Sequence, residues 1–244
     1  MNYFIYMFKT TKIKAISFDL DGTLMRQSPP CLIIKRFLEA FGLVKDVDEV
    51  VKALKSIKNY AEDLKKSDVR NYYINLNRAI LEALGVKEAV DRLAVLMYEH
   101  WFDFADARLY PDVKPVLEHL ISKNFKIGIL SDNLSADVWK LVKENGIAEF
   151  FSVVVTPDIS GFFKPDPRAY REFESRIGVD GSEILHVGDD LERDYLGAVN
   201  AGFNAVLLDR GKRIVEGVNV IHSLYELIRL LEVDDYERGD RMDC

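Results

Sequence analysis

Cysteine is scarce in this chain: only Cys31 and Cys244 occur among 244 residues. So few cysteines provide no disulfide framework, and we expect a cytoplasmic protein whose two thiols are free. Basic residues are also in deficit, with 33 lysines and arginines against 40 aspartates and glutamates and a formal charge of -7. This balance predicts no nucleic-acid partner, because a nucleic-acid surface needs clustered cations to neutralise phosphates. A small anionic ligand would need a local positive site.

The sequence also lacks an apolar run long enough to cross a membrane as a helix. The opening run Tyr3–Phe8 is apolar and aromatic but short, and no basic residues precede it. We interpret it as a loose arm or an extra edge strand, and we predict no membrane partner. A hydrophobic fraction of 48% beside 30% charged residues is typical of a globular protein with a substantial core. The length allows one large domain or a medium domain that carries a smaller insertion.

The hydrophobic pattern divides the chain into an alternating part and an all-helical part. A buried strand is predicted at Ala15–Phe18, and four helices without a strand follow it, at 31–42, 47–58, 70–84 and 87–104. Strands then alternate with helices: strands at 126–130, 152–156, 184–187 and 205–208, and helices at 112–123, 135–145, 167–177, 192–201 and 223–232. We expect the end of the chain, from Glu232 to Cys244, to fray. The alternation predicts an α/β fold with a doubly wound, mostly parallel sheet, and the helical part is an insertion after its first strand.

Polar residues follow the predicted strands, where ligands collect in open parallel sheets. Asp19, Asp21 and Thr23 follow the first strand, and Ser131 and Asp132 follow the second; Lys164 lies in the loop after the third, and Asp189, Asp190 and Asp194 follow the fourth. Because the carboxyl ends of parallel strands lie at one edge of the sheet, these side chains are candidates for a single site.

Asp19 and Asp21 are two residues apart at a strand end, so their carboxylates can face one reacting group. One carboxylate can then attack phosphorus while the other, held protonated, donates to the leaving oxygen. An isolated pair of this kind is equally typical of acids that stabilise a loop. Ser131, where a strand gives way to a helix, could hold a phosphate oxygen or simply begin the helix. Lys164 could supply a positive charge to a phosphoryl group.

Asp189, Asp190 and Asp194 place three negative charges within six residues. Such crowding is unfavourable unless a cation or solvent relieves it. Oxygen ligands without nearby histidine or cysteine favour a hard ion, and the sequence therefore predicts Mg²⁺ rather than zinc. Asp190 and Asp194 would also fit the solvated, acidic start of a helix.

Together these motifs resemble those of the haloacid dehalogenase-like (HAD) hydrolases, in particular members with a helical cap inserted after the first core strand. Asp19-Leu20-Asp21-Gly22-Thr23 is similar to the first motif, Ser131 to the second, Lys164-Pro165 to the third, and Gly188-Asp189-Asp190 through Asp194 to the fourth. The resemblance implies a Rossmann-like core of residues 1–25 and 108–244 and a cap domain of residues 26–107. It also implies that this cap closes over the core and reads the substrate beyond its phosphate.

The resemblance further implies a role for each motif residue. Asp19 would be the nucleophile and a magnesium ligand, Asp21 the general acid and base and a ligand through its backbone carbonyl, and Asp189 the third ligand. Thr23, Ser131, Lys164 and the backbone N–H of Asp132 would bind the phosphoryl group, and Asp190 and Asp194 would form an outer shell. Asp132 departs from the family, in which Asn is common, so its carboxylate is expected to point away from phosphate.

The function predicted on these grounds is a magnesium-dependent phosphatase that hydrolyses a small phosphorylated metabolite through a phospho-aspartate on Asp19. A phosphomutase would use the same core residues and stays open. A haloacid dehalogenase is disfavoured because such members need no acid at the position of Asp21. A receiver domain would have its acidic pair on the first strand and about half this length. A catalytically silent phosphate-binding module is disfavoured because every reactive position is filled. The expected state is a monomer or a homodimer.

Overall fold

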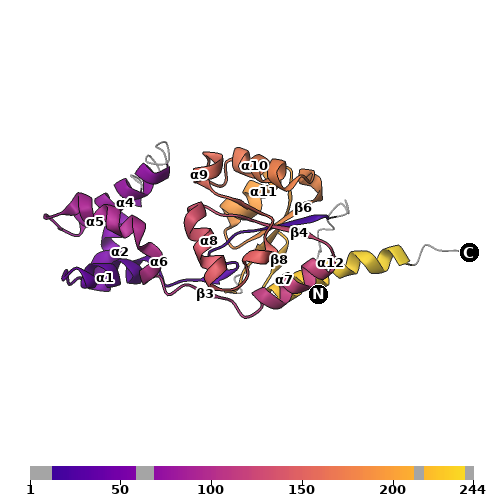
Figure 1. Cartoon of the computed structure of the whole chain (residues 1–244), viewed down its shortest axis with the longest axis horizontal. Helices are drawn as coiled ribbons and strands as arrows, with labels where there is room; N and C mark the ends of the chain where they lie inside the picture. Colours follow the sequence, from indigo (N-terminus) through magenta and orange to yellow (C-terminus); the bar gives the residue numbers. More distant parts are fainter. Residues whose placement is uncertain (1–12, 59–68, 212–216, 240–244) are drawn as a thin grey trace, which may run out of the picture. The chain divides into compact units, whose positions relative to one another are not determined.

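The computed structural model describes residues 13–58, 69–211 and 217–239 and, for side chains, residues 13–58, 70–211 and 217–232. They form two compact units, one from residues up to Arg26 and from Leu109 onward, the other from Gln27–Arg108 (Figure 1). The apolar run Tyr3–Phe8 lies outside the described residues.

A six-stranded parallel sheet forms the centre of the first unit, in the order β5-β4-β1-β6-β7-β8. The strands are β1 Ala15–Phe18, β4 Lys126–Leu130, β5 Val153–Val155, β6 Ile184–Gly188, β7 Asn204–Leu208 and β8 Val220–Ile221. Strand β1 lies between β4 and β6, and Phe18 is in register with Ile129 on one side and Val187 on the other. The loops that follow these three strands therefore leave the sheet at the same edge.

Helices cover both faces of this sheet, which confirms the predicted α/β class. The longer ones are α7 Val113–Ser122, α8 Ser135–Glu144, α10 Pro167–Ile177 and α12 Leu224–Gly239. Short elements are α9 Pro157–Ser160, α11 Gly197–Asn200, the turns Ala148–Phe150 and Gly181–Glu183, and η3, a π-helical segment at Leu191–Leu196. Figure 1 shows α10 and α11 on one side of the strands and α7 and α12 on the other. Tyr170 and Phe173 of α10 share a buried cluster with Leu130 and Val155 of the sheet.

The second unit is helical and has its own apolar core. It contains α1 Pro30–Ala40, α2 Val47–Ser56, α4 Val69–Ala83, α5 Val90–Glu99 and α6 Trp101–Phe104. Phe37 of α1, Val50 of α2, Leu81 of α4 and Met97 of α5 belong to one buried cluster. The chain leaves the α/β unit through β2 Met25–Arg26 and returns through β3 Arg108–Leu109, and these two strands pair with each other. The assignment of residues 26–107 as a cap domain stays a prediction.

Several local expectations need correction. The helix predicted at 87–104 is divided at His100, which ends α5 and precedes α6. The helix predicted at 192–201 begins as the π-helical segment η3. Helix α12 continues from Leu224 to Gly239, residues 240–244 lie outside the described ones, and the expected fraying from Glu232 stays a prediction. Strands β2, β3 and β8 were not predicted, because elements of two residues show no periodicity.

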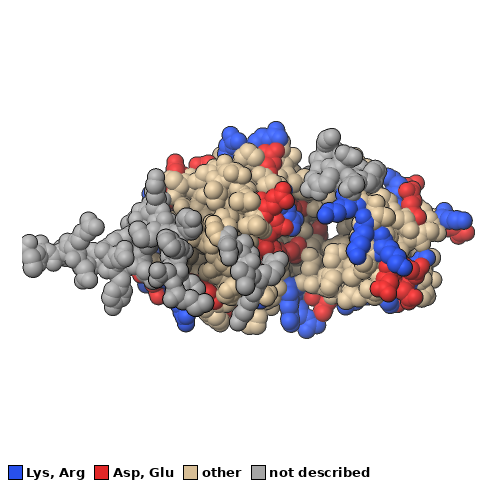
Figure 2. Space-filling view, turned by 180° about the vertical axis from the view of Figure 1, so that it is seen from behind, with Lys and Arg blue, Asp and Glu red and all other residues tan. Residues whose placement is uncertain are grey.

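Surface properties bear on the expected partners only in part. None of the helices in the described ranges has the length and apolar character that crossing a membrane requires. On the face in Figure 2, lysine and arginine side chains lie interspersed with aspartate and glutamate side chains. Cys31, in α1, is a free, partly buried thiol.

Candidate active site

Lys164 joins two carboxylates at the edge of the sheet where β1, β4 and β6 end. Its ammonium Nζ donates hydrogen bonds to Asp19 Oδ1, at 2.7 Å, and to Asp194 Oδ1, at 2.6 Å. All three residues are buried, with Lys164 only 3% exposed. Asp19 follows β1, Lys164 follows α9 and Asp194 lies in η3, so three distant parts of the sequence meet here. A buried ammonium group is tolerated because two carboxylates pair with it.

Three acids form a cluster that could hold a cation. Asp19, Asp189 and Asp194 each offer a carboxylate oxygen, and these atoms lie within 4.8 Å of one another. Gly22 permits the close approach of Asp189, because a Cβ on this glycine would lie 2.2 Å from Asp189 Oδ2. The donors are all oxygen atoms, which suits a hard divalent ion such as Mg²⁺. The structure therefore fits the predicted metal, whereas the ligand set of Asp19, Asp189 and the Asp21 carbonyl stays a prediction.

The environment shifts the pKa values of these groups in opposite directions. Burial raises the pKa of Asp189 to about 6, and the negative charge of Asp194 adds to this rise. Burial alone would also raise the pKa of Asp194, but Lys164 and His186 outweigh it and hold this pKa below its usual range. Burial disfavours the charged form of Lys164, yet Asp19 and Asp194 raise its pKa well above the ordinary value. Lys164 therefore remains a cation and Asp194 an anion.

Asp21 and Thr23 each carry a buried oxygen atom without a hydrogen-bond partner among the described residues, Asp21 Oδ1 and Thr23 Oγ1. The other oxygen of Asp21, Oδ2, accepts a hydrogen bond of 2.7 Å from Asn133 Nδ2. Burial raises the pKa of Asp21, and the hydrogen bond from Asn133 only partly opposes this rise. A carboxyl group with a raised pKa can hold a proton, as a general acid requires. Buried polar atoms without a partner are rare, so both oxygens are candidates for ligand contacts.

The two residues after β4 have local structural partners. Ser131 is buried, and its Oγ accepts a hydrogen bond of 3.2 Å from the backbone N–H of Asn133. Asp132 Oδ1 accepts a hydrogen bond of 2.8 Å from the backbone N–H of Lys164. The carboxylate of Asp132 therefore holds the loop that carries Lys164. The phosphoryl-binding roles predicted for Ser131 and Asp132 stay predictions.

Asp190 and Asp194 make different contacts around η3. Asp190 Oδ1 accepts hydrogen bonds from the backbone N–H groups of Glu192, at 3.0 Å, and Arg193, at 2.8 Å, as expected for the first residue of a helix. Asp194 Oδ2 accepts a hydrogen bond of 3.0 Å from the backbone N–H of Asp190, while its Oδ1 accepts from Lys164. Asp194 thus connects η3 to the Lys164 ammonium.

Three residues near this site were given no role from the sequence. Asn133 follows Asp132 in the loop after β4, and its contact with Asp21 spans 112 residues, beyond any local pattern. His186 lies inside β6, with Nε2 3.3 Å from Asp194 Oδ1. Its signal was a polar residue inside an apolar strand. Arg193 lies with Nη1 3.6 Å from Asp132 Oδ2, and nothing in its sequence context distinguishes it from other surface arginines.

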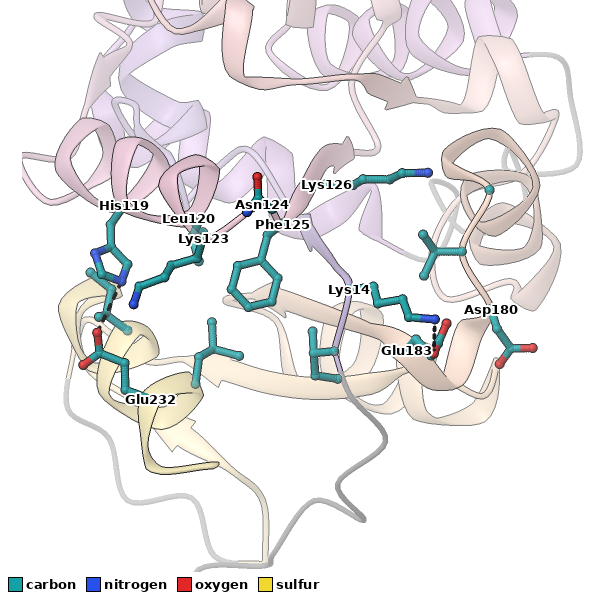
Figure 3. A pocket seen from close by; sticks show the side chains of 15 residues that line it. Lys14, His119, Leu120, Lys123, Asn124, Phe125, Lys126, Asp180, Glu183 and Glu232 are labelled. Carbon is teal, nitrogen blue, oxygen red and sulfur yellow. Dashed lines mark ion pairs between the residues drawn. The ribbon is translucent and has the colours of Figure 1, made fainter. Parts of the chain in front are cut away.

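A separate cavity of about 640 Å³ lies at the start of β1 and β4, the opposite end of these strands. Lys14, His119, Phe125 and Glu183 are among its lining residues, and none of the predicted site residues lines it (Figure 3). Two ion pairs, Lys14 with Glu183 and His119 with Glu232, lie at its rim.

Comparisons with known proteins agree with this arrangement. The sequence profile of the haloacid dehalogenase-like hydrolases matches residues 13–202. The glyceraldehyde 3-phosphate phosphatase of Methanopyrus kandleri is 32% identical over 205 residues, covering 82% of this chain and 85% of the relative. The phosphoglycolate phosphatase of Vibrio parahaemolyticus is 29% identical and covers 91% of this chain and 97% of the relative.

Among solved structures, the magnesium-bound HAD-hydrolase YfnB of Bacillus subtilis has a TM-score of 0.75 at 20% identity, covering 90% of this chain and 99% of that one. At this identity the likeness supports the fold, which is the predicted one. The curated relatives named above are phosphatases. The family match covers more than half of the chain and includes each of the four motifs. The chain therefore belongs to the haloacid dehalogenase-like hydrolase family.

Proposed function

We propose that the protein is a magnesium-dependent phosphatase that hydrolyses a small phosphorylated metabolite through a phospho-aspartate on Asp19. One observation carries the proposal: the buried Lys164 ammonium contacts Asp19 at 2.7 Å, beside a cluster of carboxylates from the loops after β1 and β6. A fixed carboxylate next to a fixed cation is suited to attack on a phosphoryl group, whose negative charge the cation offsets.

The reaction needs two steps at phosphorus. In the first, a carboxylate oxygen of Asp19 attacks the phosphorus atom, and the bond between phosphorus and the ester oxygen breaks while protonated Asp21 gives its proton to that oxygen. In the second, Asp21 takes a proton from water, whose oxygen attacks the phosphorus, and the bond to Asp19 breaks. Phosphate and the original carboxylate of Asp19 result. The raised pKa of Asp21 supports its part as the acid.

The remaining residues hold the phosphoryl group. The unpartnered hydroxyl of Thr23, the Ser131 hydroxyl, the backbone N–H of Asp132 and the Lys164 ammonium supply donors of the kind that a phosphate dianion requires. Lys164 also fixes the orientation of Asp19 through their hydrogen bond. Since these donors are supplied by the scaffold, little reorganisation is needed as charge develops on phosphorus.

Asp19, Asp189 and the backbone carbonyl of Asp21 would hold Mg²⁺, and Asp194 and Asp190 would support this site from outside. A bound magnesium ion would reduce the repulsion between the Asp19 carboxylate and a phosphate dianion. Asp194 already accepts a hydrogen bond from Lys164, so its charge is shared between the lysine and the proposed metal site.

The substrate class follows from the relatives, two of which act on phosphorylated compounds of two or three carbons, glyceraldehyde 3-phosphate and phosphoglycolate. We therefore propose a small phosphorylated metabolite as the substrate.

The test is hydrolysis of an aryl phosphate and of a panel of short-chain phosphate esters by the purified full chain. We expect turnover only with magnesium, and loss of turnover in Asp19→Asn. Asp166→Asn is the matched control. Asp166 is an aspartate that caps α10, and within the described residues its side chain contacts none of the predicted site residues. Equal turnover in excess chelator, or an active Asp19→Asn enzyme, would contradict the proposal.

A further inference from the structure

Asp132 brings an additional negative charge to the edge of the sheet where the phosphoryl group is proposed to bind. Its side chain is largely buried, and Oδ1 accepts a hydrogen bond from the Lys164 backbone N–H at 2.8 Å. Asp19, Asp189 and Asp194 already place carboxylates at the same edge. A phosphate dianion would be repelled by a further uncompensated carboxylate next to its proposed backbone donor. The Lys164 ammonium offsets part of the charge of Asp132, since it opposes the rise that burial causes in the pKa of this carboxyl group, and a second cation is needed to offset the rest.

Arg193 is placed to do this. Its guanidinium Nη1 lies 3.6 Å from Asp132 Oδ2, and Nη2 lies 3.1 Å from Asp190 Oδ2. Asp132 belongs to the loop after β4 and Asp190 to the loop after β6. The guanidinium therefore spans the two loops, and it keeps its charge at any pH at which the protein is folded.

The backbone of Arg193 is anchored on both sides. Its N–H donates a hydrogen bond of 2.8 Å to Asp190 Oδ1, and its carbonyl oxygen accepts one from the hydroxyl of the buried Tyr170. These contacts fix the direction in which the side chain leaves η3. The positive charge of the guanidinium also acts on Asp21 and Asp189. It opposes the rise that burial causes in the pKa values of both carboxyl groups.

We infer that Arg193 is a positioning residue for phosphate recognition: together with Lys164 it offsets the charge of Asp132, and it ties the loop after β4 to η3, so that the backbone of Asp132 can receive a dianion. The inference rests on the proposed function, since it assigns a phosphate to this edge of the sheet. It also accounts for the acid at position 132, where Asn is common in the family: the charge of Asp132 is paired.

The test is a double-mutant cycle with Arg193→Met and Asp132→Asn in the full chain. Asn at position 132 can still accept the hydrogen bond from Lys164, so the loop is retained while the charge is removed. For each variant, KM for a phosphate ester and the Kd of inorganic phosphate, by calorimetry, are measured with magnesium present. The Kd needs no turnover and separates this inference from the proposed function.

We expect Arg193→Met to raise KM and Kd about tenfold, because it removes a positive charge beside Asp132 and Asp190, and the dianion then meets a more negative, partly buried site. The double variant should return both constants to within about twofold of the original protein, and Arg193→Lys, which keeps the charge, should change them less than Arg193→Met. Arg176→Met is the control, because Arg176 lies near the C-terminal end of α10 and pairs there with Glu172. It should change neither constant.

Two results overturn the inference: unchanged constants in Arg193→Met, or a double variant as impaired as Arg193→Met alone. The second result would mean that Arg193 acts on phosphate without Asp132. If turnover is absent but phosphate binding follows the expected pattern, the proposed function fails and the inference stands. If the chain binds no phosphate, both fail.

Discussion

His186 Nδ1 lies 2.9 Å from Ser17 Oγ, across the pairing of β6 with β1. The other ring nitrogen, Nε2, lies 3.3 Å from Asp194 Oδ1. Burial lowers the pKa of His186, so the ring is neutral and carries one N–H. An ionised carboxylate can only accept, so the N–H is on Nε2 and the Ser17 hydroxyl donates to Nδ1. A buried chain of polar contacts thus leads to the proposed nucleophile. In order, it contains Ser17, His186, Asp194, Lys164 and Asp19.

His186→Leu should lower the free energy of unfolding by about 2–3 kcal/mol, because it leaves the Ser17 hydroxyl and one Asp194 lone pair without their buried partner. Ser17→Ala should cost less, about 1 kcal/mol, because only one neutral hydrogen bond is lost. Urea denaturation at pH 8 measures both. A His186→Leu protein as stable as the original would contradict the network.

The same histidine predicts a pH dependence. Its pKa is lower in the folded protein than the ordinary value of 6.5, so the unfolded chain binds the extra proton first as pH falls. Its contribution to stability is therefore complete above about pH 6.5 and declines as pH falls below that value. The difference in stability between the original protein and His186→Leu should shrink between pH 8 and pH 5. A difference that stays constant over this range would show that His186 does not titrate as argued.

Lys164→Met should lower the free energy of unfolding by about 3–5 kcal/mol, because it leaves the buried carboxylates Asp19 and Asp194 without their shared cation. Magnesium should recover part of this loss, since a cation that binds the folded state stabilises it by mass action. Thermal unfolding with magnesium or with chelator measures both effects. A melting temperature that magnesium leaves unchanged in Lys164→Met would count against a metal site at these carboxylates.

The sequence predicted the elements that carry the motifs because each is a buried apolar run that stops abruptly. Ala15–Phe18 was predicted with its observed bounds, since Asp19 ends the apolar run, and Lys126–Leu130 was predicted equally well. The break at His100 was missed because the apolar spacing continues from α5 into α6 without a proline or glycine.

Contacts between distant loops could not be predicted in the same way. The four motifs indicated which loops meet at the sheet edge, but not which side chains pair there. The Arg193–Asp132 ion pair depends on the direction in which η3 leaves β6, and a π-helical turn has no sequence signature. The same holds for Asn133, whose hydrogen bond to Asp21 depends on the register of β4 against β1.

Gly22→Ala should weaken magnesium affinity at least tenfold, because the new Cβ would lie 2.2 Å from Asp189 Oδ2 and must displace that carboxylate. Gly22 also has a positive φ of +79°, which adds backbone strain of about 1–2 kcal/mol for alanine. Gly42→Ala separates the two effects, since Gly42 has a similar φ of +74° and no atom within 4 Å of its would-be Cβ. Gly42→Ala should lose stability without losing magnesium affinity, as measured by metal titration of the activity. Equal magnesium affinity in both variants would show that Asp189 is not a ligand.

Thr23→Val should leave the protein as stable as before or raise its stability by up to about 1 kcal/mol, while KM for phosphate esters rises about tenfold. The Thr23 hydroxyl is fully buried without a hydrogen-bond partner among the described residues, so its replacement by a methyl group breaks no bond and removes a desolvation penalty. The backbone should stay in place, because Arg210 Nη2 donates a hydrogen bond of 2.8 Å to the Thr23 carbonyl oxygen. Denaturation and steady-state kinetics on one preparation measure both effects. A loss of stability with unchanged KM would show that the Thr23 hydroxyl stabilises the fold and does not bind the phosphoryl group. A hydroxyl whose partner is the ligand would instead cost stability in the free protein and lower KM.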